Sequence, residues 1–171
     1  MNFINDIKLQ EKDEFNMIIE IERGSKLKNE LVAPSFDKVE CVRKCKLKYP
    51  FYYGCFPQTL AGDGDPADAI LLTAKKHKTL DVVRVMPVAI IRTLDNGEED
   101  NKIICIDGSI KYVDKLIKIV DNFLHVYKGK KADMVIDPYI GSGEDATKEL
   151  LKSHKMFKDA NRNASSILEI Q

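Results

Sequence analysis

The chain has 171 residues, of which 44% are hydrophobic and 32% charged, and its 27 Lys and Arg residues balance its 27 Asp and Glu residues. This length and composition predict one globular domain over residues 1–171 and exclude a disordered chain. The zero net charge excludes a global field that attracts nucleic acid, and no apolar run reaches the roughly 20 residues of a membrane span, so neither partner is expected.

The N-terminal residues and the cysteines indicate a cytoplasmic location. The first fifteen residues mix Asp, Glu and Lys and hold no apolar core of a signal peptide. The four cysteines, at positions 41, 45, 55 and 105, show neither CxxC spacing nor the density of a disulfide scaffold. Reduced, mostly packed thiols are therefore expected.

Strands fill the first two thirds of the chain. Five segments are rich in β-branched or alternating apolar residues: Met17–Glu22, about Val39–Lys48, Ala69–Thr73, Val82–Leu94 and Lys102–Ile106. The pair Asn96-Gly97 is typical of a tight hairpin turn between the last two. The pattern predicts an antiparallel β domain that closes into a small barrel.

Two helices are expected late in the chain and outside this barrel. Apolar residues recur at helical spacing from Val113 to Tyr127, after which Lys130-Lys131 is expected on the surface. They recur again from Ala146 to Phe157, behind a start signal formed by Ser142 and Asp145. The fold class is thus mainly β with flanking helices (α+β).

The stretch Asp63-Gly-Asp65-Pro-Ala-Asp68 places three carboxylates within six residues. Crowded carboxylates repel one another, and a hard divalent cation relieves that repulsion. A solvated acidic turn is the alternative, but a predicted buried strand follows at once and would hold the loop rigidly. An EF-hand is excluded, because its sixth and twelfth positions would be Asp68 and Ala74 rather than Gly and Glu.

A second acidic cluster follows at Asp95, Glu98, Glu99 and Asp100, with Lys102 behind it. Alone it would be a solvated hairpin tip. Together with Glu20, which lies on an apolar strand, the two acidic segments predict a carboxylate-lined pocket that could hold several Mg²⁺.

Cations and phenols suited to phosphate oxygens occur in the same regions of the chain. They are Lys28 beside Glu30, Arg43, Tyr49, Tyr53 and the pair Tyr127-Lys128. Any one of these lysines, taken singly, would be a surface charge. The three histidines, at positions 77, 125 and 154, are expected to pack rather than bind metal.

Several of these segments, in order and nearly in spacing, resemble the soluble family I inorganic pyrophosphatases over about residues 15–130. They are Glu20, Lys28-Asn29-Glu30, Tyr49 to Gly54, Asp63 to Asp68, Asp95 to Lys102 and Tyr127-Lys128. The resemblance implies a five-stranded OB-like closed barrel, dependence on several Mg²⁺ and hydrolysis of pyrophosphate to two phosphates. It also implies a homo-oligomer, with a hexamer favoured over a dimer.

The resemblance further implies a role for each matching residue. Asp63, Asp68 and Asp100 match the ligands of the tighter metal, and Glu20, Glu30 and Asp95 match outer metal-binding carboxylates. Asp65 matches the residue that accepts a proton from the attacking water. The phosphate-binding group is matched by Lys28, Tyr53, Lys102, Tyr127 and Lys128.

The chain departs from the family pattern in three places. Cys41 stands where a phosphate-binding Arg is expected, and Arg43 follows two residues later. Because side chains on a strand alternate with period two, a hairpin shorter by two residues would bring Arg43 to the same face and site. Tyr52 stands where the family commonly has Asn, and Asn96 stands where a Glu is usual. These two departures concern the positioning of substrate rather than the reaction itself.

Two other functions fit the same pattern less well. An OB-like module could bind nucleic acid through strand aromatics, but its acidic face would repel a phosphate backbone. A catalytically weakened protein on the same fold is the other alternative, supported by Cys41 alone.

Overall fold

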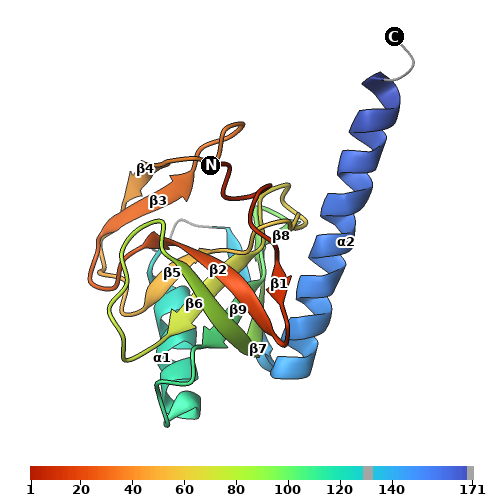
Figure 1. The fold of residues 1–171 in the computed structure, drawn as a ribbon. Helices are drawn as coiled ribbons and strands as arrows, with labels where there is room; N and C mark the ends of the chain where they lie inside the picture. The colour runs from red at the N-terminus through yellow and green to blue at the C-terminus, as the bar shows by residue number, and fades with distance from the viewer. Residues whose placement is uncertain (129–132, 169–171) are drawn as a thin grey trace.

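The computed structural model describes residues 1–128 and 133–168, with side chains to residue 165, so Lys130 and Lys131 lie outside the described range. The protein is mainly β with two helices (Figure 1). The elements are β1 (Gln10–Glu11), β2 (Glu14–Ile21), β3 (Leu27–Leu31), β4 (Val39–Lys44), β5 (Tyr52–Cys55), β6 (Asp68–Leu72), β7 (Val82–Asp95), β8 (Glu98–Glu99), β9 (Lys102–Ile106), α1 (Val113–Val126), β10 (Met134–Ser142) and α2 (Gly143–Leu168).

Five strands close into a ring in the order β2-β5-β6-β9-β7. β2 closes it by pairing twice, with β7 through Phe15 to Ile18 and with β5 through Ile18 to Ile21. The expected barrel is therefore confirmed. The expected antiparallel pairing is wrong at one place, because β6 and β9 run parallel. The long connection through β7 leaves room for that crossover.

Gly54 marks the junction of β2 and β5. A Cβ built on Gly54 would lie 1.8 Å from the backbone oxygen of Ile18, so only glycine permits this approach.

Five strands are not predicted from the sequence, and each lacks a clean period-two pattern. Two of them, β1 and β8, are only two residues long, too short to show a pattern. β5 stands out in the sequence only as an aromatic motif. β3 pairs with β4 in a separate two-stranded sheet whose residues are mostly exposed or half-buried, so burial leaves little alternation there. β10 contains Pro138 at an irregularity in its pairing with β7, and proline inside a run argues against a strand. The strand predicted to run to Lys48 ends at Lys44.

Four of the barrel strands, β2, β5, β6 and β9, are buried on both faces, which explains apolar runs such as Ala69–Leu72. On β6, Ala69 and Leu71 join one apolar cluster, to which α2 contributes Ala146 and Leu150. The alternate residues Ile70 and Leu72 join a second cluster, to which α1 contributes its own apolar side chains, Val120, Phe123 and Leu124. Each helix therefore covers a different face of the strand layer.

Both predicted helices are confirmed, but α2 is longer than predicted. Ser142 and Asp145 form the expected reciprocal cap: the Ser142 N–H donates to Asp145 Oδ2 at 2.8 Å, and the Asp145 N–H donates to Ser142 Oγ at 3.2 Å. Beyond Phe157 the helix has no apolar periodicity, and it extends clear of the barrel (Figure 1). No helix in the described part of the chain is long and apolar enough to cross a membrane.

Asp107 links the ends of β6 and β9 and provides a test of the fold. Its carboxylate accepts hydrogen bonds from Thr73 Oγ1 at 2.8 Å and Ser109 N at 3.0 Å and pairs with Lys75 Nζ at 3.3 Å. Although burial alone would raise the pKa of Asp107, the hydrogen bonds from Ser109, Thr73 and Lys75 lower this pKa to about 2.

We expect Asp107→Asn to lower the free energy of unfolding at pH 7 by about 1 to 2 kcal/mol. Because the folded-state pKa lies below the unfolded value, this stability is present above about pH 4 and is lost as the pH falls toward 2. Urea unfolding at pH 7 and at pH 2.5 checks both points. Equal destabilisation at the two pH values would contradict the assigned role.

Candidate active site

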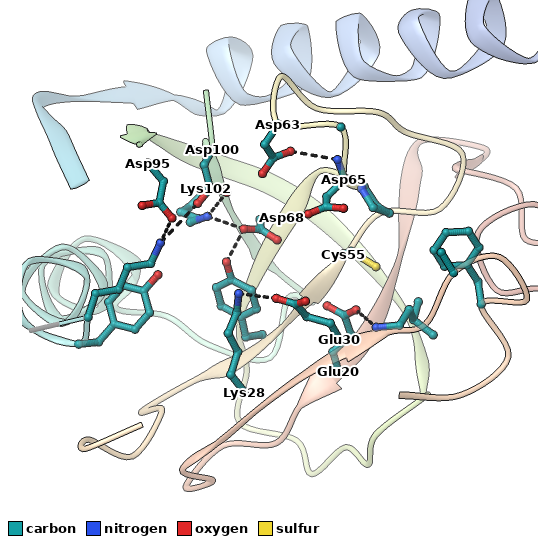
Figure 2. A pocket seen from close by; sticks show the side chains of 18 residues that line it. Glu20, Lys28, Glu30, Cys55, Asp63, Asp65, Asp68, Asp95, Asp100 and Lys102 are labelled. Carbon is teal, nitrogen blue, oxygen red and sulfur yellow. Dashed lines mark hydrogen bonds and ion pairs between the residues drawn. The ribbon is translucent and has the colours of Figure 1, made fainter. Parts of the chain in front are cut away.

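A cavity of about 310 Å³ lies between the acidic loop before β6 and the β3–β4 hairpin (Figure 2). All but one of the predicted site residues line it: Glu20, Lys28, Glu30, Tyr53, Asp63, Asp65, Asp68, Asp95, Asp100, Lys102, Tyr127 and Lys128. They come from segments spread over more than a hundred residues of chain. The exception is Arg43.

The acidic loop is held by its own backbone and by one buried threonine. The Thr59 hydroxyl donates to the Phe56 carbonyl at 2.7 Å and accepts the Ala67 N–H at 2.9 Å, which joins the two ends of the loop. Within the loop, the Ala61 N–H donates to the Asp65 carbonyl at 2.7 Å. From behind, the Ser153 carbonyl of α2 accepts the Leu60 N–H at 3.0 Å. The carboxylates are therefore mounted on a rigid support.

Lys102 lies at the centre of the acidic groups. Its side chain is 1% exposed, and its ammonium pairs with both Asp68 and Asp100. Tyr53 donates a hydrogen bond of 2.5 Å to Asp68 Oδ2. Although burial raises the pKa of Asp68, Lys102 and Tyr53 together hold this pKa below its usual value. Burial and the neighbouring Asp68 raise the pKa of Asp100 to about 7.

The other two lysines of the cavity are also paired with carboxylates. Lys128 pairs with Asp95, and its Nζ lies 3.9 Å from Asp100 Oδ2. Lys28 pairs with Glu30, two residues along the same strand and on the same face. Three acidic groups of the cavity have no lysine partner in the part of the chain that the structure describes: Glu20, Asp63 and Asp65.

Glu20 is the most enclosed of these three. It is 6% exposed, and its Oε1 accepts the Leu31 N–H at 2.8 Å. Burial raises the pKa of Glu20 to about 8. Asp65 is less enclosed, and burial together with the nearby Asp63 raises its pKa as well. Both groups therefore hold a proton more tightly than an ordinary carboxylic acid.

The donor set of the cavity fits a divalent cation such as Mg²⁺. Among residues 1–128 and 133–168, no group of three or more His, Cys, Asp or Glu side chains is arranged to hold a metal directly. Nevertheless, seven carboxylates line one cavity, and their oxygens are the ligands that hard cations prefer. Burial and mutual repulsion raise the pKa of Glu20 and Asp100, and a bound cation would relieve this cost.

Arg43 lies at the rim rather than in the wall of the cavity. Its guanidinium carbon is 5.8 Å from the centroid of the Tyr127 ring. The pairing of β3 with β4 places Arg43 opposite Lys28 and Cys41 opposite Asn29, with an irregularity between them. Because paired residues share a face and neighbours in a strand do not, Arg43 faces the side of Lys28 and Cys41 the other side. The premise that residues 41 and 43 share a face is therefore wrong.

Several other residues considered as candidates from the sequence do not line the cavity. Tyr49 is buried in an aromatic cluster, with its hydroxyl 3.8 Å from Cys45 Sγ. Glu98 and Glu99 are exposed. His154 packs against the acidic loop, with its Nδ1 2.6 Å from the Gln58 carbonyl, and none of the three histidines lines the cavity.

The cavity also has an apolar wall that the sequence does not predict. Leu31 and Phe36, from the hairpin, pack against the buried Cys55 of β5, and Ala33 also lines the cavity. Only the apolar run from Leu31 to Ala33 could have indicated it, and that run also fits an ordinary hairpin.

A small β-barrel that gathers carboxylates, lysines and tyrosines into one cavity defines a class of proteins suited to bind divalent cations and phosphate together. Comparison of the chain with known protein families agrees with this class. The family model described as inorganic pyrophosphatase matches residues 17–158, so the chain belongs to the inorganic pyrophosphatase family.

Individual relatives show the extent of the similarity. An inorganic pyrophosphatase from Methanosarcina acetivorans is 33% identical over 166 residues, which cover 87% of this chain and 95% of the relative. Soluble inorganic pyrophosphatase 2 from Chlamydomonas reinhardtii is 31% identical over 159 residues, covering 83% and 80%. The crystal structure of the inorganic pyrophosphatase from Thermus thermophilus superposes with a TM-score of 0.81 at 23% identity, covering 92% and 99% of the two chains.

Proposed function

We propose that this enzyme hydrolyses inorganic pyrophosphate to two orthophosphates in this cavity. The observation that carries the proposal is the convergence of seven carboxylates, three lysines and two tyrosines on one cavity in a chain of the inorganic pyrophosphatase family. Pyrophosphate resists attack by water because its oxygens repel a nucleophile. Catalysis therefore needs charge neutralisation and a positioned water.

The residues divide this work between them. Lys28, Lys102 and Lys128, with the hydroxyls of Tyr53 and Tyr127, would donate to the phosphate oxygens. Asp65 would accept a proton from the attacking water, a role that suits a carboxylate whose pKa is raised by burial. Mg²⁺ would be held by Asp63, Asp68, Asp100, Asp95, Glu20 and Glu30. When bound, it supplies further neutralisation of the phosphates and acidifies water.

A phosphate-release assay tests the proposal. We expect the purified enzyme to release orthophosphate from pyrophosphate at millimolar Mg²⁺ and to leave p-nitrophenyl phosphate, a monoester without a phosphoanhydride bond, largely intact. Absence of release from pyrophosphate would refute the proposal. A rate well below the family's usual activity that Cys41→Arg raises would instead identify a weakened enzyme. A nucleic-acid-binding module would release no phosphate and would bind a single-stranded oligonucleotide.

Arg43 provides a graded test of substrate binding. We expect Arg43→Ala to lower kcat/KM by about tenfold, the effect of one charge-assisted hydrogen bond at a solvent-exposed rim. Cys41→Ala is the matched control, because Cys41 lies on the opposite face of the same strand, and it should leave kcat/KM unchanged. Steady-state kinetics with pyrophosphate compares the two. Equal losses in both variants would contradict the role given to Arg43.

The cellular and oligomeric setting belongs to the same proposal. The expected location is the cytoplasm, and the expected assembly is a homo-oligomer, with a hexamer ahead of a dimer. Light scattering of the purified protein measures the assembly directly.

A further inference from the structure

All three lysines of the cavity are ion-paired with carboxylates that are candidate metal ligands (Figure 2). Lys102 bridges Asp68 and Asp100, Lys128 holds Asp95, and Lys28 holds Glu30. The same ammonium groups are the candidate donors to phosphate. Each lysine therefore has two potential anionic partners within one cavity.

We propose that these lysines act as internal counter-ions which a divalent cation replaces, so that metal binding releases ammonium groups toward phosphate. The inference rests on the proposed function and adds a mechanism that couples its two ligands. In the metal-free chain the lysines relieve the repulsion among the carboxylates. A cation bound to those carboxylates repels the ammonium groups and takes over their role.

Burial of two of the lysines makes the exchange of their anionic partners energetically important. The Lys102 and Lys128 side chains are 1% and 9% exposed, so water offers their ammonium groups little alternative solvation. A buried ammonium needs an anionic partner, and removal of one partner favours capture of another. A phosphate oxygen in the same cavity is that other partner.

The exchange has a thermodynamic consequence. Metal and phosphate should each raise the affinity of the other, and the factor must be the same in both directions. Without metal, the lysines stay engaged by carboxylates and phosphate binds weakly.

The decisive variant removes a carboxylate that holds a lysine. With EDTA present, Asp95→Asn frees Lys128 from its nearest partner. We expect it to bind imidodiphosphate, in which NH replaces the bridging oxygen, about tenfold more tightly than the unaltered chain does. Asp63→Asn is the matched control, because it removes the same charge from the same cavity, and Asp63 has no lysine partner among the described residues. It should change the affinity by no more than about twofold.

Further variants test whether the gain in affinity comes from the freed ammonium itself. Glu30→Gln frees Lys28 on a different element and should repeat the gain, which covers the case in which Asp95→Asn does not fold. Adding Lys128→Met to Asp95→Asn should remove the gain, because the freed ammonium is gone. In the absence of phosphate, Lys128→Met should bind Mg²⁺ about tenfold more tightly, whereas Arg43→Met, which removes a rim cation that pairs with no carboxylate among the described residues, should not.

Isothermal titration calorimetry measures all of these affinities without turnover. Equal affinities of Asp95→Asn and Asp63→Asn for imidodiphosphate, or a gain that survives Lys128→Met, would overturn the exchange. Because no step of the test needs hydrolysis, its outcome is separate from that of the phosphate-release assay. An enzyme that hydrolyses pyrophosphate yet shows no difference between the two asparagine variants retains its proposed function and loses only this mechanism.

Discussion

Asp68→Ala should reduce pyrophosphate hydrolysis by at least about a thousandfold and weaken Mg²⁺ binding at the same time. Asp68 begins β6 at the centre of the cavity, where its Oδ2 accepts the Tyr53 hydroxyl and pairs with Lys102. Its removal deletes a candidate ligand. It also removes one of the two carboxylates that pair with the buried Lys102 and leaves Asp100 as the remaining partner. The substitution therefore disturbs the Lys102 ammonium as well as the metal site.

Tyr53→Phe is the control for this result. It removes the hydroxyl that contacts Asp68 but leaves the carboxylate and the packing of the ring. We expect Mg²⁺ affinity within about threefold of the unaltered enzyme and a loss of activity of about tenfold. Calorimetry and phosphate release measure the two quantities. If Asp68→Ala bound Mg²⁺ normally, Asp68 would not be a ligand.

Asp65→Asn should slow turnover by at least about a hundredfold while leaving Mg²⁺ affinity largely intact, because asparagine cannot accept a proton from water. The backbone of residue 65 keeps its place, since its N–H donates to Asp63 Oδ1 and its carbonyl accepts the Ala61 N–H. The loss should therefore fall on kcat rather than on KM.

Asp63→Asn separates a ligand from a base within the same loop. Asp63 lies two residues away and is assigned to metal binding, so its substitution should lower Mg²⁺ affinity, and added Mg²⁺ should restore part of the rate. Added Mg²⁺ should not restore Asp65→Asn. Equal rescue of both variants would show that Asp65 is an ordinary ligand.

The sequence predicts the parts of the fold that carry continuous or periodic apolar runs. β6 and β9 are continuous apolar runs because two clusters cover their two faces, and α1 repeats its apolar residues because one side packs on the barrel. In the β3–β4 hairpin only β4 is predicted, because the residues of both strands are exposed or half-buried and polar residues interrupt their pattern. β10 escapes prediction because Pro138 lies inside it.

The acidic residues of the site are predictable because crowded carboxylates are costly wherever they occur in a chain. What sequence reasoning could not predict is which charges pair. Lys128 and Asp95 are 33 residues apart, and they meet because α1, which precedes Lys128, packs against the strand layer that contains β7. The premise that Cys41 and Arg43 share a face is wrong for a related reason, since one irregularity in the strand pairing shifts the period-two alternation on which that premise depends.

Metal dependence of pyrophosphate hydrolysis tests the central claim most directly. The purified enzyme, stripped of metal with EDTA and then supplied with pyrophosphate, should release phosphate only after Mg²⁺ is added, at two phosphates per pyrophosphate consumed. Ca²⁺ should support little turnover, because its larger and looser coordination shell misplaces the water. Phosphate release that is absent with Mg²⁺, or that proceeds equally well in EDTA, would contradict the account.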